Sequence, residues 1–292
     1  MAARPTLRLL AQALLLGACA LATPASAAMA LPPGAAPPLE PLLARLPSAA
    51  APAPASLAQI MARAAEFVES YGAFTPGASI RSHLTGRWDG PICLQVSGLK
   101  PEQEAAVRAR IEAVARSVAV GLEPAGCAAP NLRIGFTAEP QRLLDGLVRR
   151  DAAILGDRTS ATRNLRTVTR PIQAWYATNG ATLAGRDRRF VNVLVIVDMA
   201  RPETQTRRLS RLTDYAVMLA LSQPRDLSQC NALASITDLF AACPDRFPPE
   251  GLDEADLAYL AALYGRGAEG ADALDIAARM AMILADDKLA SR

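Results

Sequence analysis

Residues 190–198 read FVNVLVIVD, and residues 212–224, a short distance further on, read LTDYAVMLALSQP. The first stretch is an almost unbroken apolar run, which is typical of a central strand buried on both faces. The second has the length and composition of a buried helix. Together they predict a buried strand followed directly by a helix that packs on the sheet.

Further segments extend this core in both directions. Strands are expected at residues 91–99, 131–140 and 170–180, and helices at 56–72, 100–120, 140–150, 251–265 and 273–292. Because the helices gather late in the chain, we expect an α+β fold in which a mixed sheet packs against helices and the C-terminal part is mostly helical.

The first residues are expected to be an export signal. Arg4 and Arg8 precede a short apolar run, and small residues in the A-x-A arrangement place cleavage after Ala27, so that residues 1–27 form the signal peptide. The run LGAC also resembles a bacterial lipobox, in which Cys19 would carry a lipid anchor. The first interpretation predicts a periplasmic or secreted protein, and the second an outer-membrane lipoprotein.

The rest of the chain divides into three parts. Residues 28–56 are dominated by Pro and Ala, a composition typical of a disordered linker. Residues 57–89 are expected to form an N-terminal helix and a loop, and residues 90–292 a single α+β domain that includes the C-terminal helix. No apolar run after the signal is long enough to span a membrane.

The cysteine content indicates the cellular compartment of the protein, and the net charge limits the ligands that it is expected to bind. Export leaves four cysteines, an even number that predicts two disulfides in an oxidising compartment. The favoured pairing joins Cys93 to Cys127 and Cys230 to Cys243, because each pair brackets a compact local unit. The formal net charge of +3 falls to about +1 when the two arginines of the signal are removed, which is too weak to predict nucleic-acid binding.

The residue types that hydrolytic and nucleotide-binding sites need are largely missing. The chain has one histidine, His83, which excludes the H-E-x-x-H zinc motif and any site with two histidine ligands. The G-x-S-x-G, Walker A and G-x-G-x-x-G motifs are absent as well. The acids of DEADL (residues 253–257) are expected to complement a helix N-terminus rather than to act as an acid–base pair. No metal or cofactor is expected.

Basic and aromatic side chains offer candidate ligand contacts instead. Residues 149–170 carry six arginines in a Thr-rich connection, which is expected to be a solvated loop and, as the alternative, a surface for phosphate or an anionic polymer. Trp175 and Tyr176 are adjacent on an expected strand and therefore point to opposite faces, one inside and one outside. An exposed aromatic beside Arg170 would be a recognition point, because aromatic and Arg side chains dominate binding hot spots. The candidate ligand contacts are Arg170, Trp175, Tyr176 and His83.

Several segments, in this order, resemble those of the matrixin-type zinc proteases. NLRIGFTAEP (131–140) is similar to a strand that in this family often reads Ile-Arg-Ile-Gly-Phe, and residues 191–224 are similar in placement to its strand and active-site helix. SITDLF (235–240) falls where the family has its Met-turn, and GLDEADLAYLAALYG (251–265) resembles its closing helix. The resemblance covers about residues 90–267 and implies a zincin-like fold. The chain also resembles exported proteobacterial proteins with degenerate zincin-like domains.

The same resemblance implies that the zinc site of the family is lost. The positions of the first zinc histidine, the catalytic glutamate, the second histidine and the third ligand carry, in that order, Asp214, Tyr215, Met218 and Pro224. The methionine of the Met-turn corresponds to about Thr237 or Asp238. The family's mechanism needs a zinc-bound water and a carboxylate that accepts its proton, and this chain lacks both.

Three functions follow as hypotheses. The first is a catalytically inactive zincin-like domain, a pseudoprotease or binding module of the cell envelope, whose partner would be an envelope protein or a peptide. The second is a hydrolase with a site of its own around Asp214, Tyr215 and His83. The third is a lipid-anchored structural protein of the envelope, tethered through Cys19 and the Pro/Ala-rich linker.

Overall fold

The computed structural model describes residues 56–71, 86–155, 166–178, 188–224, 229–244, 246–268 and 271–290. The expected signal peptide, Cys19 and the linker up to residue 55 lie outside these residues, and so does His83. Pro54–Arg292 form one compact unit, and the description below concerns this unit.

The long strand β5 (Arg188–Asp198) is the centre of the sheet. It pairs in parallel with β3 (Leu132–Thr137) and in antiparallel orientation with β4 (Ile172–Thr178). β2 (Leu94–Ser97) continues the sheet parallel to β3, and the two-residue β1 (Gly86–Arg87) pairs with the first residues of β5. The sheet is therefore mixed and mostly parallel, which confirms the α+β prediction with a mixed sheet.

Successive side chains of β5 enter two different cores. Val193, Val195 and Val197 belong to the main hydrophobic core, whereas Leu194 and Ile196 belong to a smaller cluster on the other face of the sheet. All five side chains are at most 1% exposed. The prediction that this strand is buried on both faces is confirmed, and the period of two follows from the pleat of the strand.

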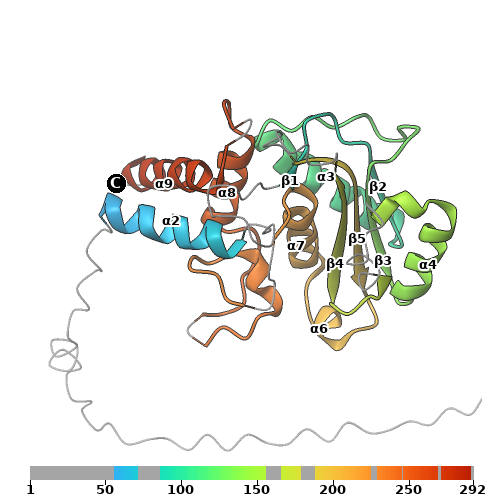
Figure 1. The fold of residues 1–292 in the computed structure, drawn as a ribbon. Coiled ribbons are helices and arrows are strands. Elements are labelled where there is room, and N and C mark those ends of the chain that lie inside the picture. The colour runs from blue at the N-terminus through green and yellow to red at the C-terminus, as the bar shows by residue number, and fades with distance from the viewer. Residues whose placement is uncertain are drawn as a thin grey trace, which may run out of the picture. The chain divides into compact units, whose positions relative to one another are not determined.

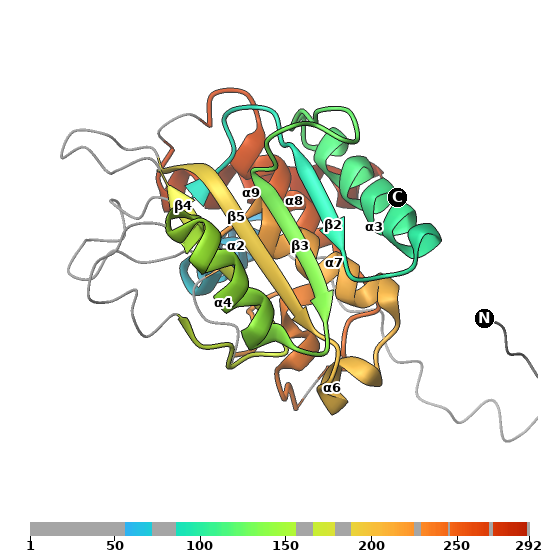
Figure 2. The ribbon, with the colours of Figure 1, turned by 90° about the vertical axis from the view of Figure 1, so that its right-hand side faces the viewer.

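Helices cover both faces of this sheet. The buried side chains of α3 (Pro101–Ser117) and α7 (Leu209–Leu221) join the main core. On the other face, α4 (Pro140–Arg150) and the 3-10 helix η2 (Ala152–Leu155) contribute to the smaller cluster. Figure 2 shows α4 in front of the sheet and running alongside β5, whereas β3 and β2 have no helix over them on this side. The short helix α6 (Pro202–Gln205) connects β5 to α7.

The C-terminal part is helical, as predicted. It contains the 3-10 helix η4 (Ile236–Phe240), α8 (Glu254–Tyr264) and α9 (Ala273–Ala290). The N-terminal helix α2 (Leu57–Tyr71) lies beside α9 (Figure 1). Aromatic contacts tie it to α8, with the Tyr71 and Tyr259 rings 4.7 Å apart. The helix before the expected domain therefore packs into the same core.

Two element boundaries differ from the sequence-based expectation for local reasons. β2 ends at Ser97 because Gly98 has a φ of 94°, a left-handed conformation that glycine adopts without steric cost. The helix expected at 212–224 begins at Leu209 and ends at Leu221, and Ser222 is already extended. Pro224 explains this early end, because a proline disfavours helical conformation in the residue before it and cannot donate a backbone hydrogen bond.

Both expected disulfides are present with the expected pairing. Cys93 is bonded to Cys127, and Cys230 to Cys243, at sequence separations of 34 and 13 residues. Disulfides are typical of the periplasm and of secreted proteins. In the chain-entropy model the shorter loop stabilises the fold by about 3 kcal/mol and the longer loop by about 4 kcal/mol. Among the described residues, no helix is long and apolar enough to cross a membrane.

Candidate functional site

The helix that the resemblance implies for an active site is α7, and its C-terminal ten residues are closed off from solvent. Residues 212–221 are all buried. A helix that supplies ligands or a base to a substrate must be reached by that substrate, and every side chain in this stretch is buried. The cavity on the α4 side of the sheet and the cavity beside the end of α3 are both lined without a residue of α7.

Asp214, at the implied first zinc-ligand position, is fully engaged in hydrogen bonds. Arg110 of α3 donates from Nε to Oδ1 at 2.6 Å and from Nη2 to Oδ2 at 3.1 Å, a bidentate arrangement. The backbone N–H of Leu252 donates to Oδ2 at 3.1 Å. A Cβ on Gly251 would lie 2.7 Å from the same oxygen, so the glycine lets this loop approach the carboxylate. Asp214 therefore joins α3, α7 and the loop before α8.

The two other implied catalytic positions of α7 serve packing. The Tyr215 ring lies 5.1 Å from that of Phe240 in an edge-to-face contact, and burial raises the pKa of the Tyr215 phenol above its ordinary value. The phenol is therefore neutral and cannot act as a base at ordinary pH. Met218 is fully buried in the main core, and its backbone carbonyl accepts hydrogen bonds from the N–H and the hydroxyl of Ser222.

The segment SITDLF, the implied Met-turn, is held by a buried carboxylate. Asp256 of α8 is 0% exposed and accepts hydrogen bonds from the Ser235 hydroxyl at 2.6 Å, the Ile236 N–H at 2.7 Å and the Asp253 N–H at 2.9 Å. Burial raises the pKa of Asp256 to about 7, against the opposing effect of these hydrogen bonds. Asp256 thus fixes η4 to the start of α8.

The carboxylate of Asp238 is the centre of a hydrogen-bond network in the loop that the Cys230–Cys243 disulfide closes. Asp238 accepts hydrogen bonds from the backbone and side-chain nitrogens of Asn231, at 3.0 and 2.7 Å, and an ion pair joins it to Arg246 at 3.4 Å. Burial raises the pKa of Asp238. Thr237, the other candidate for the Met-turn methionine position, accepts a hydrogen bond from the Asn231 amide. The polar side chains of this loop therefore form hydrogen bonds and an ion pair with one another.

The structure places the predicted ligand contacts in different environments. Arg170 is exposed just before β4. Burial raises the pKa values of Tyr176 and Tyr215, and the positive charge of Arg170 opposes this increase only in part. Trp175 is 2% exposed in the smaller cluster. Tyr176 packs against the main core and donates to the Leu219 carbonyl at 2.9 Å. The two aromatics point to opposite faces as predicted, but neither is exposed, because helices cover both faces.

Pro224 and His83 are the sequence-predicted site residues that remain to be placed. Pro224 is partly buried three residues beyond the end of α7. His83 lies outside the described residues.

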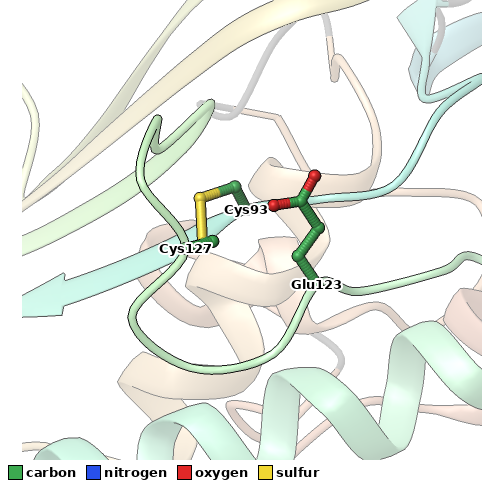
Figure 3. A group of neighbouring side chains, drawn as sticks. All are labelled: Cys93, Glu123 and Cys127. Carbon is green, nitrogen blue, oxygen red and sulfur yellow. A yellow bond between two sulfur atoms is a disulfide. The ribbon is translucent and has the colours of Figure 1, made fainter.

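One group of side chains has the composition of a metal site. Cys93, Glu123 and Cys127 place a carboxylate oxygen and two sulfurs within 4.8 Å of one another, and Figure 3 shows the carboxylate beside the sulfurs. The two sulfurs are bonded to each other, and a disulfide sulfur is not the thiolate that binds a metal. The group therefore serves as a covalent link between β2 and the loop after α3.

Arg110 is the functional residue that the sequence did not identify. A weak signal exists, because Arg110 lies three residues after Val107 and four before Val114, both of which face the core. This spacing puts Arg110 at the border of the buried face, where a cation needs a partner. The sequence gives no indication that the partner is 104 residues away.

Taken together, these features define an α+β domain with a mostly parallel sheet, a fully packed central helix and two disulfides. No family model, curated protein or solved structure matches the chain. The assignment of the protein to the α+β class therefore depends on the geometry of this chain alone.

Proposed function

We propose that this chain is a catalytically inactive, zincin-like domain of the cell envelope that binds an envelope protein or a peptide. The observation that carries the proposal is the complete burial of residues 212–221 in α7. The side chains at the implied ligand positions are used inside the protein, Asp214 by Arg110 and Leu252, and Met218 by the core.

The order of elements supports the zincin-like part of the proposal. β5 leads into α7, η4 follows, and α8 closes the region, the order that the resemblance to matrixin-type proteases implies. The carboxylate of Asp256 also connects two segments that carry the resemblance, SITDLF and the closing helix. The two disulfides support placement in an oxidising compartment.

The alternative of a hydrolase around Asp214, Tyr215 and His83 has less support. A general base needs a free lone pair within hydrogen-bond distance of the proton it accepts. Both oxygens of Asp214 already accept hydrogen bonds from cationic or backbone donors, and Tyr215 is a buried, neutral phenol.

A peptide-cleavage assay tests the proposal against this alternative. The purified protein is incubated with a proteome-derived peptide mixture, with and without added zinc, and new termini are counted by mass spectrometry. We expect no new termini above those in buffer, while an active metalloprotease in parallel produces them. The informative variant is Tyr215→Phe, which keeps the ring contact with Phe240 and removes the hydroxyl. Cleavage by the native protein that this variant abolishes would replace the proposal with the hydrolase.

A further inference from the structure

A cavity of about 370 Å³ lies on the α4 side of the sheet. Its lining residues come mainly from β2, β3, β5, α4 and η2, on the side of the sheet where β3 and β2 have no helix above them (Figure 2). This volume falls in the range of small-molecule sites. The cavity and α7 lie on opposite faces of the sheet, so a ligand here would be separate from any partner bound near α7.

The apolar part of the cavity comes from three elements. Leu143 and Leu147 belong to α4, Ile154 to η2 and Leu194 to β5. Gly135 of β3 also lines it, and a Cβ at this position would lie 2.7 Å from Leu143 Cδ2. The glycine therefore allows Leu143 to approach the sheet closely, and these side chains offer a short apolar surface to a ligand.

The polar part carries more positive than negative charge. Arg133 of β3 and Arg150 at the end of α4 both line the cavity, and within the described part of the chain neither guanidinium forms an ion pair. Arg133 donates to the Asn192 side chain at 3.0 Å, which leaves further N–H donors available. Asp151 is the one lining carboxylate, and it accepts a hydrogen bond from the Ala153 N–H at the start of η2.

We propose that this cavity binds a small organic carboxylate, with the carboxylate on Arg133 and Arg150 and a short apolar tail on Leu143, Leu147 and Leu194. Arg is suited to this role because its planar guanidinium binds a carboxylate through two parallel hydrogen bonds. Ser97 and Gln95 on the uncovered edge of the sheet supply hydrogen-bonding groups beside the two cations. Arg150, one of the six arginines of residues 149–170, thus lies in the proposed anion site.

Isothermal titration calorimetry with octanoate tests this proposal. The native protein is expected to bind octanoate saturably at one site per chain, and Arg150→Gln, an exposed position that folding tolerates, should weaken binding at least about tenfold because a charged hydrogen bond is lost. Ser97→Leu, which fills the cavity from the exposed face of β2, should weaken it as well. Arg142→Gln on the same helix is the matched control, since Arg142 pairs with Glu139 outside the cavity, and it should bind like the native protein.

Two further compounds test whether the apolar tail and the negative charge of octanoate are both needed for binding. Octanol, which has the tail without the charge, and inorganic phosphate, which has charge without a tail, should both bind at least about tenfold more weakly than octanoate. The proposal is overturned if octanoate does not saturate, if Arg150→Gln leaves its affinity unchanged, or if either probe binds as tightly as octanoate.

Discussion

Replacing Asp214 with alanine is expected to lower the free energy of unfolding by about 3 kcal/mol, the lower end of the range for breaking a buried ion pair. The substitution removes both hydrogen bonds to Arg110 and leaves the Leu252 N–H without its acceptor. The lower end applies because the Arg110 side chain is 45% exposed and can be rehydrated when its partner is gone. Urea denaturation followed by circular dichroism measures the change.

Two controls separate the ion pair from other effects of this substitution. Asp214→Asn keeps the shape of the side chain and removes its charge, so it should account for much of the loss. Glu139→Ala breaks a pair in which both side chains are more than 60% exposed, and should change stability by less than about 0.5 kcal/mol. An Asp214→Ala protein as stable as the native one would show that this position is not needed for packing.

Stability is also expected to fall as the pH rises from about 4 to about 7, because of Asp256. Its pKa is raised by burial to about 7 in the folded protein, whereas an unfolded chain has an ordinary Asp value near 3.9. Between these values the folded state binds more protons than the unfolded state, so raising the pH favours unfolding. Because of this one group, the free energy of unfolding should decrease by up to about 1.4 kcal/mol for each pH unit.

The matched variant for this pH dependence is Asp256→Asn, which cannot ionise. The free energy of unfolding is measured for both proteins at intervals between pH 4 and 7. The stability of the native protein relative to the variant should decrease steadily across this range. A constant difference, or one that increases with pH, would contradict the assignment and would mean that the three hydrogen bonds to Asp256 outweigh its burial.

Sequence patterns were sufficient for the centre of this fold. The apolar run that forms β5 has the composition of a strand buried on both faces, whereas its pairing with β3 and β4 is known from the structure alone. The four cysteines allow three pairings, and the one that local spacing favours is the one present. These features depend on short-range periodicity and on loop length, which a single sequence displays directly.

Contacts between distant elements were beyond the reach of such patterns. The sequence marks Arg110 as a border residue of its helix and Asp214 as a polar residue in an apolar one, but nothing in it connects the two. Asp256 was interpreted as a residue that favours a helix N-terminus, and it does accept a hydrogen bond at that N-terminus, but its bonds to Ser235 and Ile236 depend on tertiary packing. The cavity beside Arg133 likewise depends on tertiary packing, because its lining residues come from β2, β3, β5, α4 and η2.

We expect α7 to serve in packing alone and to hold no zinc. Zinc content is measured by inductively coupled plasma mass spectrometry after the protein has been incubated with zinc and dialysed. We predict far less than one zinc atom per chain, and an unfolding temperature that does not change when a chelator is added, since a metal bound to the folded state alone would raise it. One zinc atom per chain that survives dialysis, together with a lower unfolding temperature in chelator, would contradict the claim.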